Sequence, residues 1–340
     1  MTGHTGFKGS WLSLILSEFG AKVYGYSLPP NSDINLYSIL GIDSTVNSTL
    51  DDIRNFDALK KAYFAADPDC VFHLAAQPIV RDSYKDPRYT YETNVMGTVN
   101  ILECLRIHTG ASSFLNVTTD KVYENNDLPN HGFTEDEKLD GYDPYSNSKS
   151  CSELVTHSYR KSFFDGELSV PISTARAGNV IGGGDFANDR IMPDCVRATI
   201  KGESIIVRNP NSTRPYQHVL EPLFAYLMIA MEQAEDHDKA GYYNIGPSDE
   251  DCINTGMLAN LFVDSWGDGS SWKDISEVNA PHEAGFLKLD CSKARETFGW
   301  NPVWHVNQAV KETVLWYKAW NSGEDMKEYS SKQIREYMNG

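Results

Sequence analysis

The sequence is short of positive charge. Lysine and arginine total 30 against 47 aspartate and glutamate residues, which gives a net charge of −17. Such a chain repels the phosphates of nucleic acids and the surfaces of anionic membranes, so we expect neither as a partner. A small anionic ligand is compatible with this charge, because a local arginine cluster or a helix N-terminus can outweigh the global field.

Two further absences concern cysteine motifs and long apolar runs. The six cysteines stand tens of residues apart, without a CxxC pair or a Cys/His pair at zinc spacing. We therefore expect free thiols in a reducing compartment and no metal site. The longest apolar stretch, Leu223–Met231, is far shorter than the roughly 20 residues that span a bilayer. The apolar run at Trp11–Leu16 is too short for a signal peptide, so these features predict a cytoplasmic protein.

In the first half of the chain, short strand-like runs alternate with helical patterns. This alternation predicts βαβ crossovers and a Rossmann-type doubly wound parallel sheet. Such a fold begins with a central strand, yet Met1 stands almost directly before a glycine loop, so we expect the first strand to be missing. The expected strands are Lys22–Tyr26, Cys70–Leu74 and Phe114–Thr118, and the expected helices are Trp11–Phe19, Phe56–Ala65, Tyr89–His108 and Tyr145–Phe164.

The alternation ends after Ala175, where glycine-rich and proline-rich segments follow. Helical patterns recur at 221–233, 257–266 and 306–320. We expect a dinucleotide-binding domain at residues 1–178, with returning elements near 216–245. A smaller C-terminal α/β lobe at residues 179–340 would bind the substrate.

Gly3, Gly6 and Gly9 form a GxxGxxG loop before the first expected helix. Glycines let a backbone approach a pyrophosphate closely, and the N–H groups at a helix N-terminus attract its charge. Glycines before a helix can also form a mere turn, but the strand pattern that follows favours a dinucleotide site. No lysine or arginine occurs between Gly25 and Leu50 to bind a 2′-phosphate, which favours NAD over NADP.

Tyr145 and Lys149 form a YxxxK pair on one face of an expected helix. A nearby ammonium and a nicotinamide cation both favour the phenolate, which suits Tyr145 to take a proton from a substrate hydroxyl. The same residues are also compatible with an exposed helix start. Thr119, Asp120 and Lys121 follow an expected strand, at the edge where doubly wound sheets bind ligands, although a solvated turn would look similar.

These motifs together resemble the extended short-chain dehydrogenase/reductase superfamily, and within it the CDP-glucose branch of the nucleotide-sugar 4,6-dehydratases. The resemblance covers nearly the whole chain. The segments that carry it are TGHTGFKGSWL at 2–12, HLAAQPIV at 73–80, ETNVMGTVNILE at 92–103, TTDKVYEN at 118–125, GYDPYSNSKSCSEL at 141–154, ARAGNVIGGGD at 175–185, NPNSTRPYQHVLEPL at 209–223 and FLKLDCSKAR at 286–295.

The resemblance implies a redox-neutral dehydration of CDP-glucose to CDP-4-keto-6-deoxyglucose, with NAD as the cofactor. Hydride leaves C4 of the sugar, water is eliminated across C5 and C6, and hydride returns to C6. Tyr145, aided by Thr119 and Lys149, would act on the 4-hydroxyl group. Asp120 as acid and Lys121 as base would perform the elimination.

The resemblance also implies binding residues and a homodimer built from the helices at 89–108 and 145–164. His4 and Lys8 replace small or uncharged residues of the superfamily loop, so we expect bulk near the pyrophosphate and an exchangeable NAD. The residues matched to the sugar nucleotide are Asn179, Arg190, Arg214 and His218. Those matched to the cofactor, besides Tyr145 and Lys149, are Gly3, His4, Gly6, Phe7, Lys8, Gly9, Asp52, Ile53, Leu74, Ala75, Ala76, Asn94 and Thr118.

Other interpretations stay open from the residues alone. A 4-epimerase or a dehydratase for another nucleotide would share the fold, although an Asp120-Lys121 pair is not required by an epimerase. A non-catalytic NAD-binding protein would not need an intact set of Thr119, Tyr145 and Lys149. The nucleotide base, and the division of acid and base between Asp120 and Lys121, are left open by the sequence.

Overall fold

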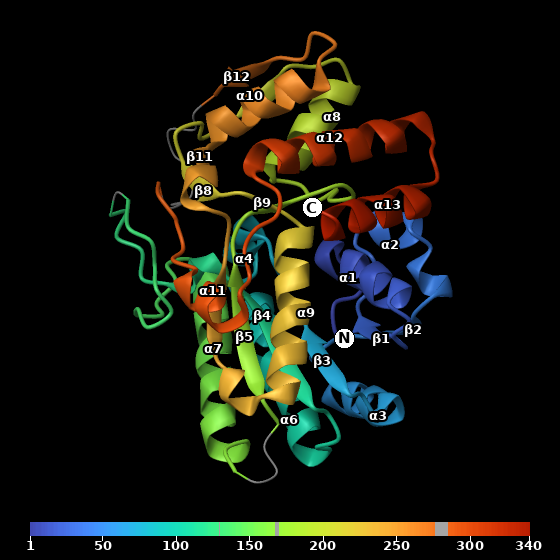
Figure 1. Ribbon diagram of the computed structural model, residues 1–340, viewed down its shortest axis with the longest axis vertical. Helices are drawn as coiled ribbons and strands as arrows, with labels where there is room; N and C mark the ends of the chain where they lie inside the picture. The colour runs from blue at the N-terminus through green and yellow to red at the C-terminus, as the bar shows by residue number, and fades with distance from the viewer. Residues whose placement is uncertain (129, 167–169, 276–284) are drawn as a thin grey trace.

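The computed structural model describes residues 1–128, 130–166, 170–275 and 285–340. A parallel sheet with helices packed around it forms one part of the molecule, and a second group of helices and short strands lies at its upper end in Figure 1. The Rossmann-type parallel arrangement predicted from the sequence is confirmed. Within the described ranges, no helix is both long and apolar enough to cross a membrane.

Four strands form the main parallel sheet in the order β10-β5-β4-β3. β4 is buried along its whole length, which is typical of a parallel strand covered on both faces. β10 comes from the later part of the chain and pairs with β5, so that segment returns to the sheet (Figure 1). The bounds are β3 Cys70–His73, β4 Ser113–Thr119, β5 Ile172–Ala177 and β10 Tyr242–Ile245.

A second parallel ladder joins β1 (Tyr24–Ser27) to β2 (Asn47–Leu50). Thr2 lies between this ladder and the main sheet, at the place of the central first strand that the sequence predicts to be missing. It forms isolated parallel bridges to Tyr26 on one side and to His73 on the other. The chain described here thus links the two ladders through one bridging residue in place of a full strand.

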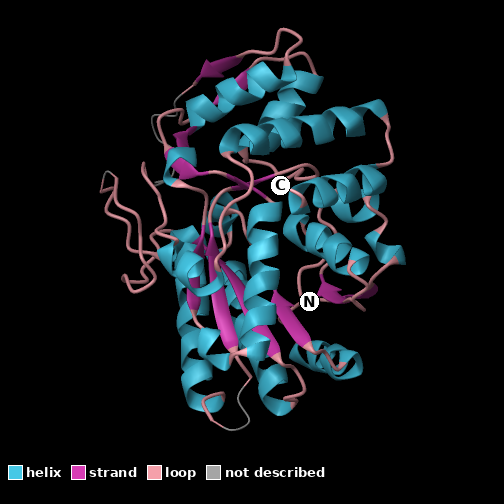
Figure 2. Ribbon diagram, viewed as in Figure 1, coloured by secondary structure: helices cyan, strands magenta, loops and turns pink. Residues whose placement is uncertain are grey.

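Helices cover both faces of the main sheet, because successive strand residues point to opposite sides (Figure 2). Phe114 of β4 packs in a core cluster with α3 and α6, whereas Leu115 and Val117 pack in a larger cluster with α9. The bounds are α1 Phe7–Glu18, α2 Leu36–Ile39, α3 Phe56–Ala66, α6 Gly97–Ile107, α7 Pro144–Phe163 and α9 Leu220–Glu235.

The helix expected at Tyr89–His108 is present, but it begins at Pro87 and contains a π turn that was not predicted. After α4 (Val80–Lys85), the chain forms α5 (Pro87–Tyr91), a π-helical turn at Glu92–Met96, and then α6. A π turn inserts one extra residue into the helical ladder, and such turns are frequent at functional sites. Here it carries Asn94, one of the residues matched to the cofactor.

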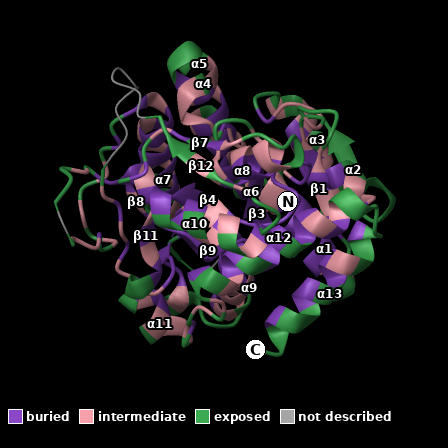
Figure 3. Cartoon of the chain, turned by 90° about the horizontal axis from the view of Figure 1, so that it is seen from above, coloured by how far each residue is buried: buried purple, intermediate pink, exposed green. Residues whose placement is uncertain are grey.

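The second group of elements packs directly against α1. Trp11 Nε1 donates to the Gly183 carbonyl (2.9 Å), and a β-carbon at Gly183 would lie 2.0 Å from Cγ of Trp316. One core cluster therefore runs through both parts. Figure 3 shows buried residues in the middle of the molecule and exposed ones toward its rim. The bounds are β6 Val180–Ile181, α8 Ile191–Ile200, β7 Ile205–Val207, β8 Thr213–Pro215, β9 Gln217–His218, β11 Cys252–Asn254, α10 Thr255–Trp266, β12 Trp272–Asp274, α11 Ser292–Phe298, α12 Val306–Ser322 and α13 Met326–Met338.

Candidate functional site

The glycine loop between Thr2 and α1 is shaped by close backbone contacts. Gly3 has a φ of +76°, and a β-carbon there would lie 2.7 Å from the Ala75 nitrogen. A β-carbon at Gly9 would lie 2.1 Å from the Gly3 carbonyl oxygen. Gly6 is the N-cap of α1, and no side chain caps the N–H groups there. The loop therefore presents a helix N-terminus that no side chain caps, which suits a phosphate group.

The His4 ring is enclosed by protein. It packs edge-on against Tyr37, its Nε2 bonds to Oγ of Ser48 (2.7 Å), and a β-carbon at Gly25 would lie 2.3 Å from the ring. Burial lowers the pKa of His4 to about 4. Its bulk faces β1 and β2, so the prediction that His4 crowds a pyrophosphate is wrong, and the exchangeable NAD inferred from it loses that basis.

Lys8 points into the interior toward α9, and its Nζ donates to the Tyr226 hydroxyl (3.2 Å). Burial lowers the pKa of Lys8 to about 7; the charges of Arg190 and Lys149 act in the same direction, and Asp120 opposes them. The Lys8 ammonium is therefore close enough to the catalytic candidates Asp120 and Lys149 to interact with their charges. Tyr226 lies inside an apolar helix pattern, where nothing in the sequence marks it as a site residue.

At the carboxyl edge of the β1–β2 ladder, Asp52 and Ile53 follow β2. Asp52 forms an ion pair with Arg54 (2.7 Å), and Ile53 is buried. β1 ends at Ser27, whose hydroxyl bonds to that of Thr5 in the glycine loop (2.8 Å). Both predicted adenosine contacts thus lie at the edge where doubly wound sheets bind nucleotides.

Asn94 connects the loop after β3 to the helix that carries the YxxxK pair. Its Oδ1 accepts from a backbone amide of that loop (2.8 Å), and its Nδ2 donates to Oγ of Ser148 (2.8 Å). Ser148 in turn donates to the Tyr145 carbonyl (2.7 Å). Residues 74–76 begin the same loop, and two of their amides donate to the Thr2 hydroxyl beside the glycines.

Thr119, Asp120, Lys121 and Tyr145 meet at the carboxyl end of β4, where a short 3-10 helix begins. Oγ1 of Thr119 donates to Oδ1 of Asp120 (2.9 Å), and Nζ of Lys121 pairs with the same oxygen (3.2 Å). Thr119 also lies close enough to the Tyr145 phenol to lower its pKa. Asp120 is fully buried, and its Oδ2 has no hydrogen-bond partner among the described residues. An acid–base pair therefore lies against the predicted base.

Tyr145 and Lys149 are both perturbed by burial. Burial raises the pKa of Tyr145 to about 12, although its hydrogen bond with Thr119 opposes this. Burial lowers the pKa of Lys149 to about 8, and the Glu153 carboxylate opposes this. Nζ of Lys149 donates to the Val117 carbonyl (3.1 Å). Because burial penalises a phenolate, a cation bound near the ring is needed to make Tyr145 a base at neutral pH.

Two of the four sugar-nucleotide candidates lie beside this group. Oδ1 of Asn179 accepts from Nζ of Lys121 (3.3 Å). Arg190 pairs with Asp185 (2.8 Å), which raises the pKa of Arg190, and Tyr145 acts in the same direction. Asp185 was missed as a site residue, although the GGGD segment contains it.

The other two candidates, Arg214 and His218, are buried. Arg214 lies on β8, next to Pro215, which faces Gly178 and the Asp120 carboxylate. The His218 ring lies between the rings of Trp11 and Trp304, with centroids 6.5 and 4.8 Å away, and burial lowers its pKa to about 3. Arg214 is therefore on a strand that reaches the site, whereas His218 packs as a neutral ring in the core. The role of Gly178 beside Asp120 was also missed.

Comparison with known proteins agrees with this arrangement. The sequence profile of a family described as GDP-mannose 4,6 dehydratase matches residues 1–313. The chain is 45% identical over 343 residues to a CDP-glucose 4,6-dehydratase of Salmonella typhimurium, which covers 99% of this chain and 95% of that protein. A dTDP-glucose 4,6-dehydratase of Streptomyces antibioticus is 26% identical over 74% of this chain and 71% of its own.

Two solved structures share the fold. A UDP-glucose 4-epimerase of Thermotoga maritima with UDP-glucose has a TM-score of 0.82 at 20% identity, over 94% of this chain and 98% of its own. A dTDP-glucose 4,6-dehydratase of Bacillus anthracis in complex with NAD has a TM-score of 0.79 at 21% identity, over 97% and 98%. The resemblance inferred from the motifs is confirmed by the profile and the Salmonella relative, and the chain belongs to the 4,6-dehydratase family that the GDP-mannose 4,6 dehydratase profile describes.

Proposed function

We propose that this protein is an NAD-dependent CDP-glucose 4,6-dehydratase, which converts CDP-glucose to CDP-4-keto-6-deoxyglucose and water. The observation that carries the proposal is the meeting of Thr119, Asp120, Lys121 and Tyr145 at the carboxyl end of β4. CDP-glucose is chosen as the substrate because the Salmonella relative, which is similar over nearly the whole chain, is named CDP-glucose 4,6-dehydratase.

NAD fits the residues present. β-carbons at Gly3 and Gly9 would collide with the backbone of the glycine loop and of the loop after β3. The N-terminus of α1 has no side-chain cap. When bound, NAD would supply the acceptor for the hydride from C4 of the sugar and the donor for its return to C6. The cofactor also brings the positive charge that Tyr145 needs to form a phenolate. The chain would hold it through the glycine loop, Asp52, Asn94 and Lys149.

Tyr145 is the base for the 4-hydroxyl group. Thr119 lies beside the Tyr145 phenol, so its hydroxyl can bind the same sugar oxygen and fix its orientation. Once C4 is a ketone, the proton on C5 becomes acidic, and the site must remove it while protonating the departing 6-hydroxyl group.

Asp120 and Lys121 supply that second proton transfer. Their ion pair has a separation of 3.2 Å between Nζ and Oδ1. Transfer of one proton from Lys121 to Asp120 leaves a neutral amine, which can take the C5 proton, and a carboxylic acid, which can protonate the leaving hydroxyl. The pair therefore contains both groups needed for elimination, and a 4-epimerase needs neither.

Arg190, Arg214 and Asn179 would bind the diphosphate and sugar. Two guanidinium groups can form forked hydrogen bonds to phosphate oxygens. Arg190 is held by Asp185 beside Tyr145, so a diphosphate bound there would place its sugar near the phenol. His218 is buried among aromatic rings and is the weakest of the four candidates.

Incubation with CDP-[4-²H]glucose tests the proposed function. We expect a 4-keto product with deuterium at C6, because the hydride removed from C4 returns there. A C4-inverted sugar that retains deuterium at C4 would identify an epimerase instead. NAD binding without turnover would identify a non-catalytic protein. Parallel reactions with dTDP-glucose and UDP-glucose measure the preference for the nucleotide base of the substrate.

We also propose a homodimer in a reducing compartment. The helices expected to form the interface expose large apolar side chains: Met96 is 49%, Leu154 53% and Phe163 55% exposed. Burying such side chains against a second copy is favourable. All six cysteines are free thiols, in keeping with the expected compartment. Sedimentation should give a dimer that Leu154→Asp dissociates, and a wild-type monomer at micromolar concentration would refute the assembly.

A further inference from the structure

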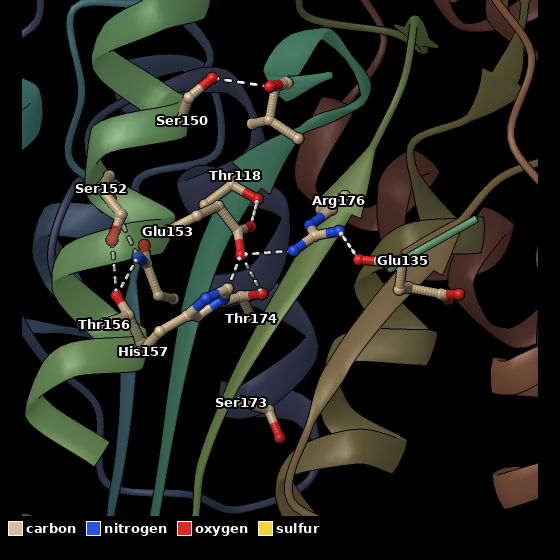
Figure 4. Close-up of polar contacts among 12 residues, drawn as sticks. Thr118, Glu135, Ser150, Ser152, Glu153, Thr156, His157, Ser173, Thr174 and Arg176 are labelled. Atoms are coloured by element: carbon tan, nitrogen blue, oxygen red, sulfur yellow. Dashed lines mark hydrogen bonds and ion pairs between the residues drawn. The ribbon is translucent and has the colours of Figure 1, made fainter. Parts of the chain in front are cut away.

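A buried polar cluster lies one helical turn beyond Lys149 on α7, and the mechanism above does not use it. Its centre is Glu153, which is fully buried (Figure 4). A buried carboxylate is stable only when hydrogen bonds and opposite charge replace water. The groups in contact with its oxygens are Oγ1 of Thr118 (2.5 Å), Oγ1 of Thr174 (2.7 Å), Nη2 of Arg176 (3.0 Å) and Nε2 of His157 (3.2 Å).

Arg176 keeps this carboxylate charged. Burial alone would raise the pKa of Glu153, but the Arg176 guanidinium and the hydrogen bonds hold it well below its usual value. Arg176 is itself fully buried on β5, where its Nη1 donates to the Tyr123 hydroxyl (2.8 Å) and the Glu135 carbonyl (3.0 Å). A buried ion pair of this kind is often no more stable than an apolar pair of the same volume. Stability is therefore a weak reason for its presence.

The two oxygens of Glu153 have different surroundings. Oε2 forms hydrogen bonds with the side chains of Thr174, Arg176 and His157. Oε1 accepts a hydrogen bond from Oγ1 of Thr118 on β4. Thr118 directly follows Val117, whose carbonyl accepts from Nζ of Lys149. Oε1 therefore faces the segment of β4 that holds Lys149, and Arg176 approaches from the other oxygen.

Titratable groups on three elements interact with Lys149. Lys8 on α1 and His73 on β3 both interact with it electrostatically, as does Glu153 on α7. Burial lowers the pKa of His73 to about 3, so it carries no charge near neutral pH. Lys8 repels the ammonium, and Glu153 attracts it.

We propose that Glu153 is a positioning residue for Lys149, with its buried carboxylate holding the Lys149 ammonium charged and in place beside the cofactor site. The inference rests on the role given to Lys149 under the proposed function. Tyr145 acts at the other end of the same helical turn, so a Lys149 that lost its proton would leave the phenol without its cationic neighbour.

The test measures Lys149 directly, in protein labelled with ¹³C at lysine Cε and assigned with Lys149→Met. In Glu153→Gln, which keeps the side-chain shape, the titration midpoint of Lys149 should fall by about one pH unit or more. Thr174→Val is the matched control: it removes one hydrogen bond to the same carboxylate but leaves the charge, so the midpoint should stay. If Glu153→Gln alone unfolds because Arg176 is left unpaired, the double variant Glu153→Gln/Arg176→Met takes its place and is compared with Arg176→Met, so that the two proteins differ only in the charge at position 153.

An unchanged midpoint in the folded charge-removing variant would overturn the inference, and so would an equal shift in Thr174→Val. In turnover of CDP-glucose, the alkaline limb of the kcat/KM profile should move to lower pH together with the midpoint. A structural effect alone would scale the profile without moving it. Wild-type protein that does not turn over CDP-glucose would refute the proposed function and leave the NMR result readable.

Discussion

Gly178 and Asp120 lie so close that a β-carbon on Gly178 would come within 2.4 Å of Oδ2 of Asp120. The same β-carbon would lie 2.8 Å from Cγ of Pro215 on β8. Only a glycine lets this carboxylate lie buried between β4 and β8. Since Oδ2 has no hydrogen-bond partner among the described residues, the carboxylate offers a ready acceptor to a substrate group.

Replacing Gly178 should therefore disturb chemistry without disturbing the cofactor. In Gly178→Ala we expect the methyl group to push Asp120 out of line, with kcat reduced by about tenfold or more. Affinity for NAD should stay within about twofold of wild type. Gly132→Ala is a suitable control, because a β-carbon there has its nearest contact at 3.4 Å. Equal activity of the two variants would show that Asp120 tolerates displacement.

Tyr145→Phe should remove turnover while the fold and the cofactor site persist. A positioned acid–base group contributes about 10²–10⁴-fold to rate, and we expect a loss of kcat in that range. Tyr91→Phe is the matched control, since the Tyr91 hydroxyl bonds to Asn147 at 2.9 Å and takes no part in the proposed mechanism. A Tyr145→Phe protein with more than about a tenth of wild-type kcat would exclude Tyr145 as the base.

Variants of the Asp120–Lys121 pair should separate oxidation from elimination. In Asp120→Asn and Lys121→Met the hydride can still leave C4, but water cannot leave across C5 and C6. Mixing either variant with NAD and CDP-glucose should accumulate reduced cofactor, seen by its near-ultraviolet absorbance, whereas the wild type should show little at steady state. Variants that form the 4-keto-6-deoxy product at the wild-type rate would refute the assigned roles.

The parts of the site that follow from short spacings were predictable from the sequence. A tight loop before a helix needs glycines, which the sequence has at Gly3, Gly6 and Gly9. The spacing of Tyr145 and Lys149 puts both on one face of a helix, whatever the tertiary structure. Thr119 could be placed at the edge of the sheet because it ends an apolar run that becomes β4. These inferences need only local periodicity and the parallel topology.

Other features depend on contacts between distant segments and could not be predicted. β2 is exposed along its whole length and has no apolar alternation, so Asn47–Leu50 carried no strand signal. The direction of His4 is decided by the space over Gly25 and by the bond to Ser48. Lys8 meets Tyr226 across more than two hundred residues of sequence. The π turn at Glu92–Met96 interrupts a helix whose apolar pattern gives no sign of it.

Acid stability should report the three buried histidines His4, His73 and His218. Burial lowers their pKa values from 6.5 to about 4, 3 and 3, so the unfolded chain binds protons that the folded chain does not. These histidines therefore do not lower the free energy of unfolding above about pH 6.5. They lower it as the pH falls from there toward their pKa values in the folded protein. Each contributes a slope of about 1.4 kcal/mol per pH unit in that window.

The measurement is the free energy of unfolding from denaturant titrations at pH 7 and pH 5. His218→Asn keeps an acceptor for the Leu220 amide. In this variant, the decrease in the free energy of unfolding between pH 7 and pH 5 should be smaller than in the wild type by the contribution of one histidine. Leu223→Val, a buried change without a titrating group, should lower stability equally at both pH values. If the His218 variant lost as much stability on acidification as the wild type, His218 would titrate in the folded protein as it does in the unfolded chain, and its place between Trp11 and Trp304 would have to admit a charge.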